Sequence, residues 1–149
     1  MQRLLTGLAV AAIVGIHAPV VRAGGECPPA VRSAAVKAHP DAAVTACKQE
    51  KEHGKTQYEV KLTGKAGEKL ELDVSPDGTI LLTEEYVDLK NVPPAVMNAF
   101  HGKYAGATPT RAEKQTAADG KVSYELAFAV SGKKKEATFT SEGGFVEEE

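Results

Sequence analysis

The sequence predicts an α+β fold, a tandem repeat of a helix followed by a four-stranded antiparallel sheet, with the helices packed on one sheet face. Residues 27–46 align on residues 92–111 without a gap, and both segments contain Pro-Pro-Ala-Val. After each segment, apolar and polar residues alternate in short runs separated by glycine-containing turns. This alternation is typical of antiparallel strands with one buried face. Similarity that keeps its order and spacing over this length indicates an internal duplication.

The N-terminal segment, residues 1–23, is predicted to be a signal peptide. Arg3 gives a cationic start, residues 4–16 are mostly apolar, and small residues occupy the positions that a signal peptidase reads before a cut after Ala23. A membrane-spanning helix needs about 20 consecutive apolar residues, more than this run provides. We therefore expect an exported chain that begins at or near Gly24, in the periplasm or outside the cell.

The charge balance excludes some partners. The chain has 18 Lys and Arg residues and 20 Asp and Glu residues. Removal of Arg3 and Arg22 with the signal peptide makes the formal charge −4 instead of −2. Because binding to a phosphate backbone needs an excess of basic residues, nucleic acid is not an expected partner. No later apolar run is long enough to cross a membrane, so no membrane association is expected after signal cleavage.

The first repeat is predicted to cover residues 24–90. Its helix begins at Pro29, since proline is favoured at the first helical position, and Val31 and Ala35 recur at helical spacing. Pro40 ends the helix, because the residue before a proline leaves the helical region. Alternation then predicts strands over residues 57–62, 69–74 and 79–86, and a strand over 42–49 rests on the weakest pattern.

The second repeat is predicted to cover residues 91–149. Pro94 begins its helix, Val96 and Phe100 lie on the apolar face, and Gly106 ends it. The strands of this half follow from the alignment with the first, which pairs Tyr124-Glu125 with Tyr58-Glu59 and Gly143 with Gly78.

The residues at the helix starts, strands and turns carry a family resemblance. They are Pro29-Ala30-Val31, Tyr58-Glu59-Val60 and Asp77-Gly78, with Pro94-Ala95-Val96, Tyr124-Glu125-Leu126 and Gly143-Gly144 in the second half. The chain resembles the PepSY-like domains of exported bacterial proteins, whose tandem units look like the β-lactamase inhibitory protein. The resemblance implies a non-catalytic periplasmic module, in some cases linked to enzyme inhibition. No inhibitory contact residue matches position by position, so none is assigned.

The sequence predicts no catalytic residue, cofactor or metal site. It contains no nucleophile-elbow pattern, and the three histidines of the exported chain, His39, His53 and His101, lack the spacing of metal ligands. A metal site that combines His39 or His53 with the cysteines is the less favoured alternative.

The two cysteines, Cys27 and Cys47, are expected to form a disulfide, since export places them in an oxidising compartment. A helix over residues 29–38 travels about 15 Å. Residues 42–47 return about the same distance as a strand, which brings Cys47 back beside Cys27. A pair of free thiols or a redox site is the rival reading, and the absence of a Cys-x-x-Cys spacing weighs against it.

The partner surface is expected on the sheet face of the second repeat, and the open alternative is that the small residues there merely tolerate a flat surface. In the first repeat this face carries charged residues, whereas in the second it carries mostly small ones, and an uncharged face costs less to desolvate on binding. The candidate residues are Ser123, Glu125, Ala127, Ala129, Thr138 and Thr140. The expected function is a non-catalytic module that binds or inhibits a periplasmic or extracellular enzyme, with a protein or a second copy of the chain as partner. The alternative is a periplasmic sensor of a small ligand or a metal.

Overall fold

The structure is a computed structural model that describes residues 27–149. The predicted signal peptide and its cleavage site lie outside the described residues. Within residues 27–149, no helix has the length and apolar character needed to cross a membrane.

The elements run in the order helix, four strands, short 3₁₀ helix, helix and four strands. They are α1 (Pro29–Ala38), β1 (Ala43–Glu52), β2 (Lys55–Thr63), β3 (Lys69–Val74), β4 (Ile80–Val87), η1 (Leu89–Asn91), α2 (Pro94–Lys103), β5 (Arg111–Ala117), β6 (Val122–Val130), β7 (Lys133–Thr140) and β8 (Phe145–Glu148). The segment with the weakest strand pattern therefore becomes β1, a strand of 10 residues. Both helices begin at the second proline of their Pro-Pro pair.

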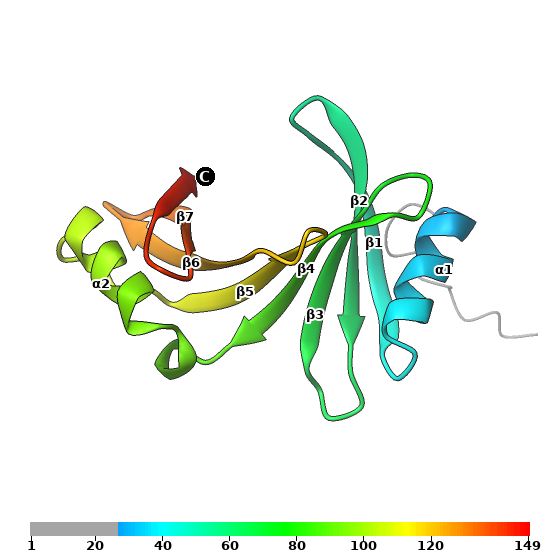
Figure 1. Ribbon diagram of the computed structural model, residues 1–149, viewed down its shortest axis with the longest axis horizontal. Helices are drawn as coiled ribbons and strands as arrows, with labels where there is room; N and C mark the ends of the chain where they lie inside the picture. The colour runs from blue at the N-terminus through cyan, green and yellow to red at the C-terminus, as the bar shows by residue number, and fades with distance from the viewer. Residues whose placement is uncertain (1–26) are drawn as a thin grey trace, which may run out of the picture.

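All eight strands form one antiparallel sheet in the order β1 to β8 (Figure 1). The prediction of a tandem repeat of a helix followed by a four-stranded antiparallel sheet is wrong, because the eight strands form a single sheet. Strand β4 pairs with β5, with Leu82 opposite Ala117 and Val87 opposite Ala112, so the sheet is continuous across the middle of the chain. Two separate sheets would leave β4 and β5 as edges with unpaired N–H and C=O groups, and this pairing satisfies them.

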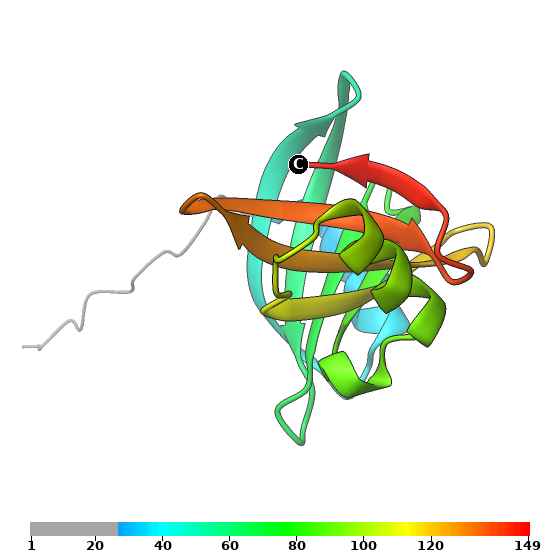
Figure 2. The same ribbon diagram turned by 90° about the vertical axis from the view of Figure 1, so that its left-hand side faces the viewer.

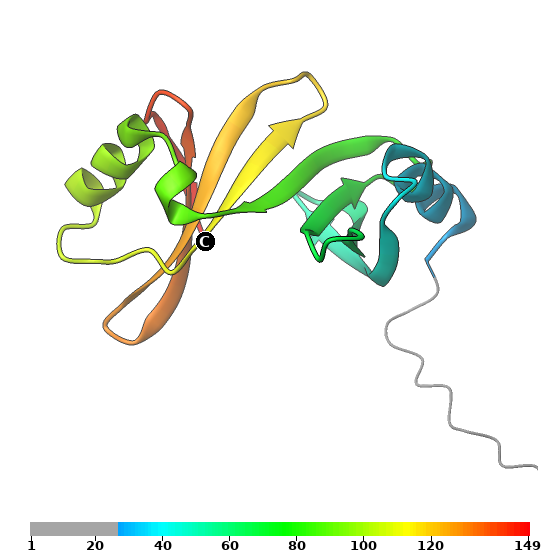
Figure 3. The ribbon, with the colours of Figure 1, turned by 90° about the horizontal axis from the view of Figure 1, so that it is seen from below.

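Both helices cover the same face of the sheet, at its two ends (Figures 1 and 3). Helix α1 buries Val31 and Ala35 against side chains of β1, β2 and β3. Helix α2 buries Val96 and Phe100 in a second core, which is formed mainly by β5, β6 and β7. The second core is aromatic: the rings of Phe100 and Phe128 meet edge to face with centroids 5.0 Å apart. The opposite face of the sheet carries no helix among the described residues.

Two glycines hold strand turns tightly against the helices. A Cβ added to Gly78 would lie 3.0 Å from the carbonyl oxygen of Ala30, in the first turn of α1. A Cβ added to Gly143 would lie 2.6 Å from the carbonyl oxygen of Ala95, in the first turn of α2. Both glycines also have φ near +90°, which other residues adopt only with strain. The β3–β4 and β7–β8 turns therefore need glycine for contact as well as for conformation.

A disulfide joins Cys27 to Cys47, as the sequence predicts, with 5.5 Å between their Cα atoms. It links the residues before α1 to the middle of β1, where Cys47 is buried in the first core. The bond fixes the start of α1 against the edge strand of the sheet.

Candidate binding groove on the uncovered sheet face

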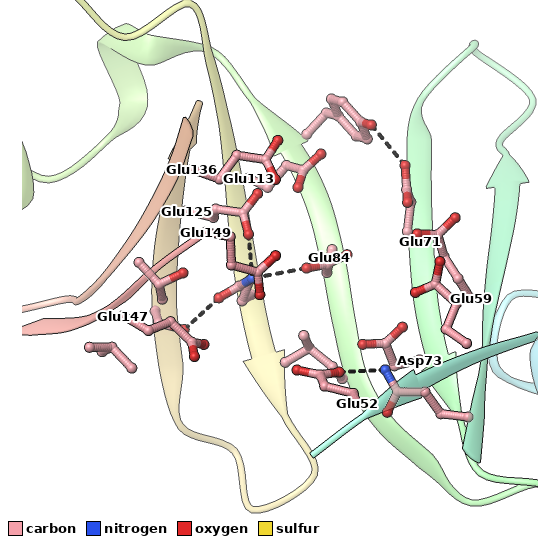
Figure 4. A pocket seen from close by; sticks show the side chains of 18 of the residues that line it. Glu52, Glu59, Glu71, Asp73, Glu84, Glu113, Glu125, Glu136, Glu147 and Glu149 are labelled. Atoms are coloured by element: carbon pink, nitrogen blue, oxygen red, sulfur yellow. Dashed lines mark hydrogen bonds between the residues drawn. The ribbon is translucent and has the colours of Figure 1, made fainter. Parts of the chain in front are cut away.

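The uncovered face of the sheet curves into a groove of about 590 Å³ that residues from all eight strands line (Figure 4). Eleven carboxyl side chains line it, and we call it the acidic groove. They are Glu50, Glu52, Glu59, Glu71, Asp73, Glu84, Glu113, Glu125, Glu136, Glu147 and Glu149. Three basic side chains, Lys51, Lys61 and Arg111, also line it. The end of β8 runs toward the β1–β2 hairpin (Figure 2). Carboxylates of β1 and of the C-terminal residues therefore line the same groove.

Sheet register produces the groove. Side chains alternate between the faces of a strand, so the residues between the buried core positions all point to the uncovered face. Strand β5 contributes Arg111, Glu113 and Gln115 in this way, while Ala112 between them packs in the second core. Strand β4 contributes Glu84 and its alternate neighbours.

Several carboxylates lie directly opposite each other on neighbouring strands. Glu71 on β3 is opposite Glu84 on β4. Glu113 on β5 is opposite Glu125 on β6. A third pair, Glu59 and Asp73, joins β2 to β3. Like charges directly opposite each other destabilise a sheet, so the sequence carries a cost at three neighbouring places.

Neutral side chains bridge some of these carboxylates. The side-chain amide of Gln115 donates to Glu84 at 2.9 Å and to Glu125 at 3.3 Å. The hydroxyl of Ser123 donates to the Gln115 carbonyl oxygen at 3.1 Å, which orients the amide toward the two glutamates. On the β3 side, the Tyr86 hydroxyl donates to Glu71 at 2.8 Å.

The basic side chains form ion pairs with carboxylates only at the two flanks of the groove. Lys61 lies 3.2 Å from Glu59 and 2.8 Å from Glu71. On the other flank, Arg111 lies 2.6 Å from Glu136 and 3.5–3.6 Å from the opposed pair on β5 and β6. Among the described residues, no lysine or arginine makes an ion pair with Asp73 or Glu84, which lie between the flanks. The centre of the groove therefore has negative charge without a partner cation.

Burial raises the pKa values of the central carboxyls. The pKa of Asp73 rises to about 7, through burial and then through the charges of Glu52 and Glu59. Burial likewise raises the pKa of Glu84 to about 7, although the hydrogen bond from Gln115 opposes the shift. The pKa of Glu125 rises to about 8, through burial and nearby carboxylates. Groups with such values change protonation state near neutral pH.

Three of these carboxyls are close enough to share a cation. One oxygen each from Glu84, Glu113 and Glu125 lies within 4.8 Å of the other two. Acidic clusters are common in proteins without an ion, and we assign no metal here. The alternative metal site of the sequence, a histidine with the cysteines, does not form, because both cysteines are in the disulfide.

The structure divides the six predicted partner-binding residues among three places. Ser123, Glu125 and Thr138 line the acidic groove. Ala127 and Ala129 line an adjoining, mostly apolar hollow of about 520 Å³. Thr140 lies in neither, and its hydroxyl accepts a hydrogen bond from the Gly144 amide. That these residues bind a partner stays a prediction.

That surface was predicted because its sheet face was expected to be largely uncharged, but carboxyl side chains line this face. Strands β6 and β7 alone carry mostly small residues on this face, but β5 pairs with β6 and adds Glu113 to it. Glu84, Glu113 and Gln115 were missed as site residues. The alternation of residues 82–86 and 111–115 could have placed them on one face, but only the pairing of β4 with β5 brings them together.

Comparisons with known proteins support the fold. No family model matches the chain, and no curated protein matches it. Solved structures do. A predicted periplasmic protein from Bacteroides eggerthii matches with a TM-score of 0.66 and 19% identity, over 84% of this chain and 89% of the other. A DUF2874 family protein from Bacteroides uniformis matches with a TM-score of 0.65 and 17% identity, over 83% and 89%.

A third match bears on the resemblance seen in the sequence. A BLIP-like protein from Bacteroides fragilis, that is, one like the β-lactamase inhibitory protein, matches with a TM-score of 0.59 and 24% identity. The match covers 83% of this chain and 86% of the other. At these identities the similarity shows the fold and no more, and membership of the PepSY-like family stays a prediction. The chain has a BLIP-like fold.

Proposed function

We propose that the chain is an exported, non-catalytic binding module whose acidic groove is the binding surface. The observation that carries the proposal is the groove itself, an uncovered sheet face to which all eight strands contribute. A folded chain gains nothing in stability from opposing carboxylates, whereas a surface that binds a ligand is often costly to maintain in its free form.

The location and the class of function rest on two further facts. The Cys27–Cys47 disulfide suits an oxidising compartment such as the periplasm. The solved structures with the same fold include a predicted periplasmic protein and a BLIP-like protein. Inhibition of an enzyme is one form that binding by this module would take.

A second candidate function is a periplasmic sensor of a small ligand or a metal. The close approach of Glu84, Glu113 and Glu125 is the observation that favours it. Metal analysis of the protein purified without chelator, followed by calorimetric titration with Ca²⁺, tests this candidate directly.

The binding proposal is tested by blocking the groove. Thr138 lies on the groove lining and is 5% exposed, so Thr138→Arg would fill and partly neutralise the groove. Glu142→Arg in the exposed β7–β8 turn is the matched control, since it adds the same side chain outside the groove. With each protein immobilised, we expect the wild type and the control to retain the same protein from periplasmic extract, and the groove variant to lose it. Equal retention by all three, with the groove variant folded by circular dichroism, would place the binding surface elsewhere.

A further inference from the structure

We infer that the acidic groove binds an extended basic segment of a partner protein, with arginine or lysine side chains at alternate positions. This inference rests on the proposed function and names the class of partner. It is carried by the charge of the groove, its dimensions and one polar side chain on its lining.

The charge of the groove is complementary to a basic segment. Eleven carboxyl groups face three basic groups. Lys61 and Arg111 neutralise the flanks, while Asp73 and Glu84 have no basic partner among residues 27–149. A cation placed between the flanks would interact with carboxylates from β3, β4 and β5 at once. It would also reduce the repulsion that remains between the opposed carboxylates.

The dimensions suit an extended segment better than a single ion. Neighbouring strands lie about 4.8 Å apart, so the carboxylates on β3 and those on β6 are separated by at most about 14 Å. In an extended segment, side chains on one face recur about every 7 Å, so three alternate basic residues span about the same distance. The groove volume of about 590 Å³ also accommodates several side chains rather than one ion.

Thr138 is a second observation that points to a ligand. It lies directly opposite Glu125 on one side and Glu147 on the other. Its side chain lines the groove, the residue is 5% exposed, and within the described chain no hydrogen bond engages its hydroxyl. Because the described residues contain no buried side-chain oxygen or nitrogen without a partner, this hydroxyl is accessible from the groove. A guanidinium group between Glu125 and Glu147 would donate to both carboxylates and to this hydroxyl, because its five donors form a planar fork.

The experiment uses two peptides of the same composition. One alternates, acetyl-Arg-Ser-Arg-Ser-Arg-Ser-amide, and the other has the three arginines first and the three serines after them. Binding of each to the chain from Gly24 to Glu149 is measured by calorimetry at pH 8 and low salt. We expect the alternating peptide to bind at least fivefold more tightly than the clustered one, because only its three charges lie on one face and span the distance from β3 to β6. Higher salt should weaken both.

Charge-matched variants locate the site. Glu84→Gln/Glu125→Gln removes two carboxylates from the groove, and we expect at least tenfold weaker binding of the alternating peptide. Glu85→Gln/Glu142→Gln removes the same charge from positions that do not line the groove, and binding should stay within twofold of wild type. Equal binding of the two peptides, or equal weakening in the two double variants, would show general charge attraction and overturn the inference.

Other occupants are separate outcomes of the same measurements. If spermine or Ca²⁺ binds the wild type and the alternating peptide does not, the groove is a site for small cations. If sedimentation shows a dimer that Glu84→Gln/Glu125→Gln dissociates, the occupant is a second copy of the chain. Each of these results contradicts the inference. If the peptides fail to bind while Thr138→Arg still abolishes capture from extract, the groove binds a partner of different chemistry and the proposed function stands.

Discussion

Glu113 and Glu125 face each other across β5 and β6, at directly opposed positions of the uncovered sheet face. Glu113 is only 4% exposed, and burial raises its pKa even though Arg111 lies nearby and opposes the shift. Two carboxyls this close cannot both ionise without strong repulsion. The pair therefore makes the fold sensitive to pH and to cations.

The stability of the chain should fall as pH rises from 5 to 9. The pKa values of Asp73, Glu84 and Glu125 are about 7, 7 and 8 in the folded chain, above the ordinary value for carboxyl groups in an unfolded one. Between the unfolded-state and folded-state pKa values, the folded chain therefore binds more protons than the unfolded chain. The stabilisation that these three groups contribute is complete below about pH 4 and is lost as pH rises through 7 to 8. After a discount for solvent screening, we expect a loss of about 1 kcal/mol, or about 4 °C in Tm. Thermal melts over this pH range measure it.

The variant Glu84→Gln/Glu125→Gln is the control for that prediction. Glutamine does not titrate, so the Tm of the variant should depend less on pH than that of wild type. A wild-type Tm that rises between pH 5 and pH 9 would contradict the sign of the effect.

Loss of the disulfide should destabilise the fold substantially. Cys27 and Cys47 are separated by 20 positions, and closing a loop of this size stabilises by about 3 kcal/mol in the chain-entropy model. Denaturation of the Cys27→Ser/Cys47→Ser variant by urea, compared with wild type, measures the difference. Thiol titration of the unfolded, unreduced wild type should find no free thiol, and two free thiols would refute the bridge.

Gly143→Ala should be more destabilising than Gly120→Ala. Both glycines have φ above +80°, so alanine is strained at either position by about 1 kcal/mol. Only at Gly143 would the added Cβ also meet backbone, the Ala95 carbonyl oxygen at 2.6 Å, while nothing lies within 4 Å of it at Gly120. We expect an additional loss of about 2 kcal/mol at Gly143, because overpacking forces the turn away from α2. Equal losses in urea denaturation would mean that the turn moves freely.

The exported protein should begin at or within two residues of Gly24. The prediction follows from the apolar segment and the small residues before Gly24 in the sequence. N-terminal sequencing of protein recovered from the periplasm or the medium tests it. Retention of Arg3 in that protein would exclude cleavage at this site.

The sequence was a good guide to local structure and a poor one to the arrangement of strands. Alternation placed Val60 and Leu72 in the core, and the Pro-Pro pairs marked both helix starts. These features follow from the backbone near each residue. The pairing of Val87 with Ala112 joins segments on either side of α2, and no local pattern encodes it.

The candidate site was missed for the same reason. Glu84 and Glu125 are distant in sequence and look like ordinary exposed residues of two strands. They come into one groove only because β5 lies between their strands and both point away from the helices. Their raised pKa values follow from that assembly, because burial is the largest cause in both. The sequence pattern of a single strand carries no information about which strands become its neighbours.

The order of strands in the sheet is also their order along the chain, and this order affects how the chain folds. Each strand finds its partner in the next strand to emerge, mostly across a short hairpin, so the contact order is low and the entropy of loop closure is small. The exception is the connection from β4 to β5, which includes η1 and α2. We expect the N-terminal four strands to fold first and to present β4 as a template. The second half then condenses on this edge, and the groove forms last.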